Sequence, residues 1–125
     1  MDPLEAFSNQ QYMNVETFRK SGEGVRTPVW FVALNGELCF TTEATSAKVK
    51  RIRREPSVKV APCKVNGELL GDWYPGKARF VSADEKPAIE KVYSRKYGFQ
   101  KFLFELFARL RGKERLFIDI KLENT

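Results

Sequence analysis

The side chains best suited to chemistry lie between positions 41 and 54, where hydroxyl groups precede a run of cations. The hydroxyls belong to Thr41, Thr42 and Ser46. The cations of this segment are Lys48, Lys50, Arg51, Arg53 and Arg54. A helix that begins at Ser46 would direct its first N–H groups and the positive end of its dipole toward an anion. The segment therefore predicts an anion site, most naturally for a phosphate.

The position of each cation along that helix determines how well its side chain can contact the phosphate. Lys48 stands in the first turn and is best placed, with Lys50 or Arg51 next. Arg53 and Arg54 fall on the solvated face. A short basic helix alone is equally typical of a solvated surface without a ligand, so the neighbouring hydroxyls are what favour the anion site.

Most routes to catalysis by side chains are missing from the sequence. The chain has no histidine, so it has neither a Ser-His or Cys-His nucleophile pair nor a histidine metal site, and we expect no metal. Glycine-rich nucleotide fingerprints are absent as well. Cys39 and Cys63 lie in apolar runs, which favours buried free thiols in a reducing cytoplasm over a disulfide. If the protein is an enzyme, a bound cofactor supplies the reactivity.

The phosphate site requires a strand pair that leads the chain into the basic helix. Strands at 25–34 and 37–42 flank Asn35-Gly36, a pair typical of a tight hairpin turn. Pro28 cannot donate to a strand ladder, so it marks an edge, a bulge or a bend. Periodicity predicts these further elements: helices at 3–10, 46–54, 84–97 and 99–111, and strands at 11–20, 57–63, 74–82 and 114–122. Six strands with hairpin connections predict a small closed or partly open β-barrel.

Length and composition limit the class of protein. A chain of 125 residues with 42% hydrophobic residues forms a single domain, 1–125, with one core. The net charge of +6 favours anionic partners. The N-terminus lacks the pattern of a signal peptide, and no apolar run is long enough to span a bilayer. We therefore expect a soluble cytoplasmic protein.

Several of these motifs together resemble a known family. They are Arg-Thr-Pro-Val-Trp-Phe-Val, a strand ending in Thr-Thr, Ser-x-Lys-Val-Lys-Arg-Ile-Arg-Arg-x-Pro-x-Val, and Ala-Pro-Cys. In order and spacing the chain resembles the pyridoxamine 5'-phosphate oxidase-like, FMN-binding split-barrel flavoproteins. Within that family it looks like the branch of probable deazaflavin-dependent (F420) oxidoreductases. The resemblance covers about residues 11–122.

The resemblance implies a mainly β fold, a six-stranded split β-barrel with short helices that forms a homodimer with two cofactor sites at the subunit interface. It places Ser46 and Lys48 at the cofactor phosphate, with Lys50 or Arg51 assisting. It places the polar strand end, Thr41 and Thr42, near the ribityl chain and phosphate. The strand beside the ring system would be Thr27, Pro28, Val29 and Trp30. Many relatives carry an arginine where Ser46 or Ala47 stands here, so the choice between F420 and FMN stays open.

Three functions remain as hypotheses. The first is an oxidoreductase that transfers a hydride between the bound cofactor and a small organic substrate. The second is a protein that binds or carries the cofactor without turnover. The third, more remote, is an OB-like barrel that binds single-stranded nucleic acid. The apolar stripe of helix 99–111 fits burial in the barrel or dimer better than a membrane surface, so we expect neither nucleic acid nor membrane as partner.

Overall fold

The computed structural model describes residues 2–98 and 114–123 of the chain. The elements, in chain order, are the 3-10 helix η1 (Pro3–Phe7), β1 (Tyr12–Phe18), β2 (Gly24–Trp30), β3 (Val32–Leu34), β4 (Glu37–Glu43), α1 (Ala47–Arg54), β5 (Ser57–Cys63), β6 (Tyr74–Phe80), α2 (Lys86–Tyr97) and β7 (Arg115–Leu122). The predicted helix 99–111 lies outside the described residues.

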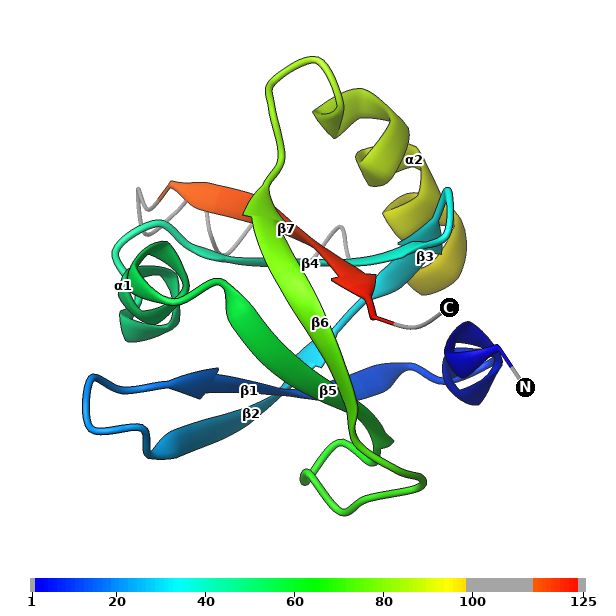
Figure 1. The fold of residues 1–125 in the computed structure, drawn as a ribbon. Helices are drawn as coiled ribbons and strands as arrows, with labels where there is room; N and C mark the ends of the chain where they lie inside the picture. Colours follow the sequence, from blue (N-terminus) through cyan, green and yellow to red (C-terminus); the bar gives the residue numbers. More distant parts are fainter. Residues whose placement is uncertain (1, 99–113, 124–125) are drawn as a thin grey trace.

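The seven strands form one antiparallel sheet in the order β2-β1-β5-β6-β7-β4-β3. Strands β2 and β3 follow each other directly in the sequence but lie at opposite edges of this sheet. The sheet must therefore curl until its two edges approach, and β2 contacts β4 across the gap. Figure 1 shows the resulting half-barrel, with α1 beside the gap and α2 over the strand pair β3–β4.

The predicted strand 25–34 is divided in two at Phe31, so the sheet has seven strands rather than the six expected. Side chains of α2 form hydrogen bonds with the backbone of Phe31. The Phe31 N–H donates to Tyr97 Oη at 2.9 Å, and the Phe31 carbonyl accepts from Lys96 Nζ at 2.8 Å. These contacts replace the ladder hydrogen bonds that a continuous strand would need. Pro28 instead stays within the edge strand β2, opposite Asn14 of β1.

The core fills the concave side of the curled sheet. Alternate residues of the central strands point inward and are buried: Met13, Val15, Phe40, Val60, Ile118 and Ile120. Val49 and Ile52 of α1 join them, so the apolar side of the basic helix is fixed against the barrel. A second cluster lies under α2, where Ile89, Tyr93 and Tyr97 pack on Val32 and Cys39.

Several local predictions are confirmed. The hairpin turn uses left-handed backbone at Asn35 (φ 53°) and Gly36 (φ 78°), which this residue pair tolerates. Ser46 caps α1, its Oγ accepting the Val49 N–H at 3.3 Å. Cys39 and Cys63 are both buried and free. None of the described helices is long and apolar enough to cross a membrane.

Candidate functional site

A pocket of about 280 Å³ opens beside the start of α1, where the two sides of the curled sheet approach each other. Its walls come from five elements: the ends of β2 and β4, the starts of β1 and β7, and the first turn of α1. The lining residues are Tyr12, Pro28, Val29, Trp30, Thr41, Thr42, Lys48 and Arg115. We call it the α1 pocket.

The fold brings six of the ten predicted site residues together in this pocket, namely Pro28, Val29, Trp30, Thr41, Thr42 and Lys48. Ser46 lies directly behind the lining, with its Oγ 3.3 Å from the Thr42 hydroxyl. The other three predicted residues, Thr27, Lys50 and Arg51, are not part of the lining. The structure thus joins two stretches that are separate in the sequence: the end of β2 and the β4–α1 junction.

Lys50 and Arg51 are directed elsewhere. Lys50 is exposed on the outer face of α1. Arg51 turns toward β1, where its Nε donates to Thr17 Oγ1 at 2.6 Å. Arg54 likewise reaches β1 and donates to the carbonyl of Phe18. Of the five cations of the basic helix, Lys48 alone lines the pocket.

Lys48 is a partly buried cation without a carboxylate partner among the described residues. Its ammonium lies 5.7 Å from the centre of the Phe40 ring, and no described acceptor is hydrogen-bonded to it. Loss of water around the ammonium lowers the pKa of Lys48 to about 8, and the nearby guanidinium groups of Arg51 and Arg115 add to the effect. An anion that enters the pocket would stabilise this partly buried ammonium, which has no carboxylate partner among the described residues.

Arg115 supplies a second cation that the sequence did not reveal. It begins β7 opposite Glu43 of β4, and its Nη2 donates to the Thr41 carbonyl at 3.1 Å. Burial lowers the pKa of this guanidinium, although Glu43 nearby raises it. None of the described residues that line the pocket is acidic. Two cations therefore line this end of the pocket, and Glu43 behind the lining offsets part of the charge of Arg115.

The polar end of the pocket also offers hydroxyl groups and helix N–H groups. Thr41 Oγ1 donates to the Leu116 carbonyl at 3.1 Å and keeps its lone pairs as acceptors. The Thr42 and Ser46 hydroxyls share one hydrogen bond, which leaves one of their two protons for another acceptor. At the start of α1, Ser46 Oγ accepts the Val49 N–H, and the N–H groups of Ala47 and Lys48 have no acceptor within the helix. The opposite end is formed by Pro28, Val29 and Trp30 and is mainly apolar.

Thr27, one residue before this apolar wall, carries a buried hydroxyl with an unusual environment. Its Oγ1 is shielded from solvent and has no hydrogen-bond partner among the described residues. A buried hydroxyl in that state costs free energy, so its neighbourhood is incomplete without a further polar group. The predicted ring-side strand thus combines apolar side chains with one unsatisfied hydroxyl.

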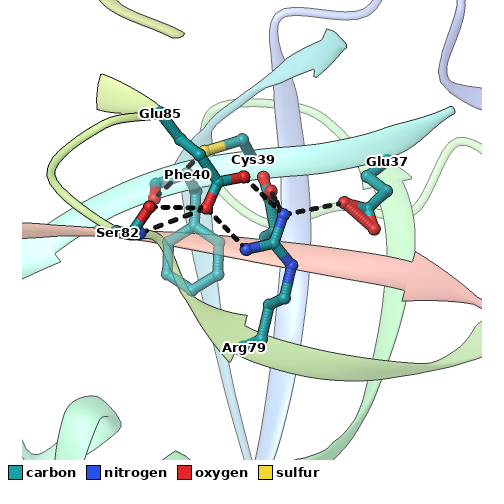
Figure 2. Close-up of polar contacts among 7 residues, drawn as sticks. Glu37, Cys39, Phe40, Arg79, Ser82 and Glu85 are labelled. Atoms are coloured by element: carbon teal, nitrogen blue, oxygen red, sulfur yellow. Dashed lines mark hydrogen bonds and ion pairs between the residues drawn. The ribbon is translucent and has the colours of Figure 1, made fainter. Parts of the chain in front are cut away.

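A second polar cluster lies at the far end of β4 and consists of Glu37, Arg79, Glu85 and Asp119. Figure 2 shows Arg79 between Glu37 and Glu85. Arg79 Nη2 lies 2.8 Å from both Glu85 and Asp119 and 3.3 Å from Glu37. Burial raises the pKa of Asp119, whereas Arg79 holds the pKa of Glu85 at about 2. Because one guanidinium ties three carboxylates from β4, β7 and the N-terminus of α2, we interpret this Arg79 cluster as structural.

The two thiols and the remaining described carboxylates provide neither a ready nucleophile nor a metal site. Burial raises the pKa of the Cys39 and Cys63 thiols, so neither is a ready nucleophile. Among residues 2–98 and 114–123, no group of three or more Cys, Asp or Glu is arranged to hold a metal ion. The α1 pocket is therefore the candidate site with the richest chemistry in the described part of the chain.

Comparisons with known proteins identify the fold. No family model and no curated protein matches the chain. Among solved structures, it is similar to the heme storage protein HutZ from Vibrio cholerae, with a TM-score of 0.73, 11% identity and coverage of 98% of this chain and 88% of that one. It is also similar to a candidate pyridoxamine 5'-phosphate oxidase from Listeria innocua (TM-score 0.67, 14% identity, coverage 97% and 90%). A third similar structure is a FAD-binding protein from Mesorhizobium loti, with a TM-score of 0.65, 13% identity and coverage of 97% of this chain and 85% of that one.

These likenesses show that the chain has the split-barrel fold of the pyridoxamine 5'-phosphate oxidase-like proteins, as the sequence predicted. Proteins of this fold include flavin-binding and heme-binding members. At 11–14% identity the similarity concerns the fold, so function must be argued from the α1 pocket itself.

Proposed function

We propose that the α1 pocket binds a phosphate-bearing, flavin-type cofactor, FMN or the deazaflavin F420, and that the protein is an oxidoreductase. The observation that carries this proposal is the two-ended character of the pocket. Lys48, Arg115 and the Thr41–Thr42 strand end form a cationic, hydroxyl-rich end, and Pro28, Val29 and Trp30 form an apolar end. A phosphate joined to a flat ring system has the same two-ended chemistry.

The residues present fit such a group in their donor set. Lys48 and Arg115 would hold the phosphate through charge-assisted hydrogen bonds, and Ser46, Thr42 and the first N–H groups of α1 would complete its shell. The strand from Pro28 to Trp30 would lie against the ring. When bound, such a ring accepts a hydride from, or gives one to, a small organic substrate.

The protein's own part in that reaction is binding and orientation. None of the described residues that line the pocket is a carboxylate or a histidine, and Lys48 is assigned to the phosphate, so we assign no general acid or base. Apolar side chains at the ring end exclude water, and the cations at the other end fix the phosphate. This division corresponds to direct hydride transfer at the ring, with the substrate held next to it.

Heme fits the chain less well, although some proteins of this fold bind it. Heme iron is held by axial ligands, most often histidine, with cysteine, methionine or tyrosine as alternatives. The sequence has no histidine, and both cysteines are buried with raised pKa values. Among the described residues that line the α1 pocket, Tyr12 is the single possible axial ligand. The cationic end of the α1 pocket is suited to bind a phosphate. We therefore favour a flavin-type cofactor.

We further propose that the protein acts as a homodimer whose second subunit completes this site. The pocket, at about 280 Å³, lies just below the range for pockets that bury a ligand of this kind, which is about 300–1,000 Å³. Its ring-side wall is the edge strand β2. A second copy placed against that edge would enlarge the wall. Light scattering at micromolar concentration should give twice the chain mass, and a value near 14.4 kDa would contradict the dimer.

Titration with three related ligands tests the proposed binding. Riboflavin lacks the phosphate of FMN but has the same ring, so the two separate the ends of the pocket, and F420 tests the deazaflavin ring. We expect FMN or F420 to bind, with FMN at least about tenfold tighter than riboflavin, because a charged hydrogen bond contributes about 1.5–3 kcal/mol. If none of the three binds, the proposed function is wrong. Equal binding of FMN and riboflavin would contradict the phosphate assignment.

The enzyme hypothesis and the carrier hypothesis differ in turnover. An oxidoreductase should bleach its bound cofactor when a suitable reductant is added and recover the colour with an acceptor. A protein that only carries the cofactor should bind it equally well but show no bleaching across broad panels of reductants and substrates. The absorption spectrum of the loaded protein reports both outcomes.

A further inference from the structure

A second cavity lies on the other side of the β2–β3 junction from the α1 pocket, and it is larger, about 410 Å³. Residues adjacent in the chain line the two spaces: Tyr12 and Trp30 face the α1 pocket, whereas Gln11 and Phe31 face the second cavity. The backbone of the β1 start and of the strand break therefore separates them. We call this second space the Lys96 cavity, after the charged residue in its wall.

Lys96 reaches the cavity from the last turn of α2. Its Nζ donates to the Phe31 carbonyl at 2.8 Å and lies 3.6 Å from the centre of the Phe31 ring. No carboxylate of the described residues forms an ion pair with it. Burial lowers the pKa of Lys96 to about 8. An ammonium has three donors, so two remain beyond the Phe31 carbonyl.

The other walls combine aromatic and amide groups. Phe7 meets Phe31 edge to face, with ring centroids 5.9 Å apart. Both rings and Val32 are buried in the core, so Val92 and Ala33 provide the accessible apolar surface of the cavity. The segment 8–11 contributes the hydroxyl of Ser8 and three side-chain amides. None of the described lining residues is acidic, and Lys96 is the single cation among them. A ligand for this space therefore has an apolar body and one negative charge.

We propose that the Lys96 cavity is a separate ligand site for a small monocarboxylate with an apolar body. The carboxylate would pair with the Lys96 ammonium, and the apolar body would lie against Val92 and Ala33. This site does not depend on the cofactor assignment, because no described residue lines both this cavity and the α1 pocket. It would give the protein a second specificity, for a small organic acid.

A purely structural role for Lys96 is the competing explanation. In that case the ammonium only satisfies the Phe31 carbonyl at the strand break and rests on the aromatic ring. A lysine with that role alone would give the cavity no preference for anions. The charge preference of the cavity thus separates the two explanations.

Calorimetric titration with 2-naphthoate and its uncharged analogue 2-naphthamide measures that preference. We expect the wild-type protein to bind 2-naphthoate at least about tenfold more tightly than 2-naphthamide, as a charge-assisted hydrogen bond requires. Lys96→Met should remove the preference. Lys91→Met, an exposed lysine of the same helix, should keep it. Val92→Trp should abolish binding of both probes by filling the cavity while Lys96 remains, so the test does not depend on one variant.

Two further measurements locate the bound probe. Lys48→Met should leave 2-naphthoate binding unchanged, and saturating FMN should not displace it, because both act at the α1 pocket. The proposal is overturned if 2-naphthoate fails to bind or shows no preference over 2-naphthamide. It is also overturned if Lys96→Met binds like wild type, or if FMN competes with the probe in a manner that requires Lys48. The preference for 2-naphthoate over 2-naphthamide and its loss in Lys96→Met are independent of whether FMN itself binds.

Discussion

Tyr97 stacks on Trp30, with ring centroids 4.8 Å apart and the ring planes 14° apart. The stack joins the last turn of α2 to the end of β2, 67 residues earlier in the chain, and Trp30 also lines the α1 pocket. The Tyr97 hydroxyl continues the connection, because it accepts the Phe31 N–H and lies 2.7 Å from the Gln11 carbonyl and 2.6 Å from the Phe31 carbonyl. Helix α2 thus fixes the point at which the sheet divides.

Tyr97→Phe should destabilise the fold while keeping the ring stack. The change removes the acceptor of the buried Phe31 N–H, and an unsatisfied buried group costs about 1–3 kcal/mol. Urea unfolding measures the loss. Tyr74→Phe is the matched control, since the Tyr74 hydroxyl makes no hydrogen bond with the described residues and its ring packs on Phe7. Equal midpoints for the two variants would show that Tyr97 does not hold the strand break.

Arg79→Met should destabilise the protein more at neutral pH than at acidic pH. At neutral pH it leaves the buried Asp119 carboxylate without its cation, at a cost of about 1–3 kcal/mol. Burial already raises the pKa of Asp119, and loss of Arg79 raises it further, so protonation at low pH relieves the penalty.

Glu85 makes the stability difference between wild type and Arg79→Met change with pH in the same direction as Asp119 does. Its lowered pKa means that its stabilising pair with Arg79 is present above the ordinary pKa of 4.5 and is lost as pH falls toward about 2. The difference between wild type and Arg79→Met should therefore shrink as pH falls. Arg95→Met, at an exposed arginine of α2, is the control. A difference that stays constant from pH 7 down to pH 3 would contradict the assigned role of the Arg79 cluster.

Val29→Trp should block the α1 pocket at its ring end. Val29 lines the pocket, so an indole there occupies the space assigned to the cofactor ring. Val29→Ala should change the affinity for FMN by less than about tenfold, because it removes only apolar contact. Val25→Trp, on the same strand but outside the lining, is the control, with circular dichroism to confirm folding. If Val29→Trp binds FMN like wild type, the ring does not lie against β2.

The affinity for FMN should fall as pH rises above about 8. The pKa of Lys48 is lowered to about 8 in the free protein, and a bound phosphate would raise it again. Each pH unit above 8 then weakens binding up to about tenfold, until the pKa of the complex is reached. Lys48→Met should show a flat profile from pH 7 to pH 9. A wild-type profile as flat as that of the variant would exclude Lys48 from the phosphate contact.

The same shift fixes the sign of the stability change in the ligand-free protein. The folded-state pKa of Lys48 lies below its ordinary value of 10.5, so between about 8 and 10.5 the unfolded chain holds the extra proton. This residue therefore makes stability rise with pH across that window.

Much of the site could be predicted from local sequence because its signals are local. The Asn35-Gly36 turn, the Ser46 cap and the period of Val49 and Ile52 each depend on neighbours within a few residues, and the structure has all of them. These features place Lys48 at the first turn, beside the end of β4. Thr41, Thr42 and Lys48 consequently lie together in the pocket lining. The other three predicted residues in the lining, Pro28, Val29 and Trp30, were expected from the family resemblance, and the curl of the sheet brings them there.

The remaining features depend on contacts between distant segments. The strand break at Phe31 has no glycine or proline beside it and is made by Lys96 and Tyr97 from α2. Arg115 reaches the pocket because β7 pairs with β4, a neighbour that the order of strands in the sequence does not disclose. Arg51 was predicted to assist the phosphate, but the structure places its guanidinium on Thr17 of β1.

The most direct test of the account compares Lys48→Ala with Lys50→Ala in FMN titrations at pH 7. The two lysines lie on the same helix two residues apart, but Lys48 lines the α1 pocket and Lys50 is exposed to solvent. The account predicts a ten- to hundredfold loss of affinity for Lys48→Ala, about 1.5–3 kcal/mol, and a change of less than about twofold for Lys50→Ala. Equal losses in both variants would show that α1 acts as a diffuse basic patch, and the phosphate site would then be wrong.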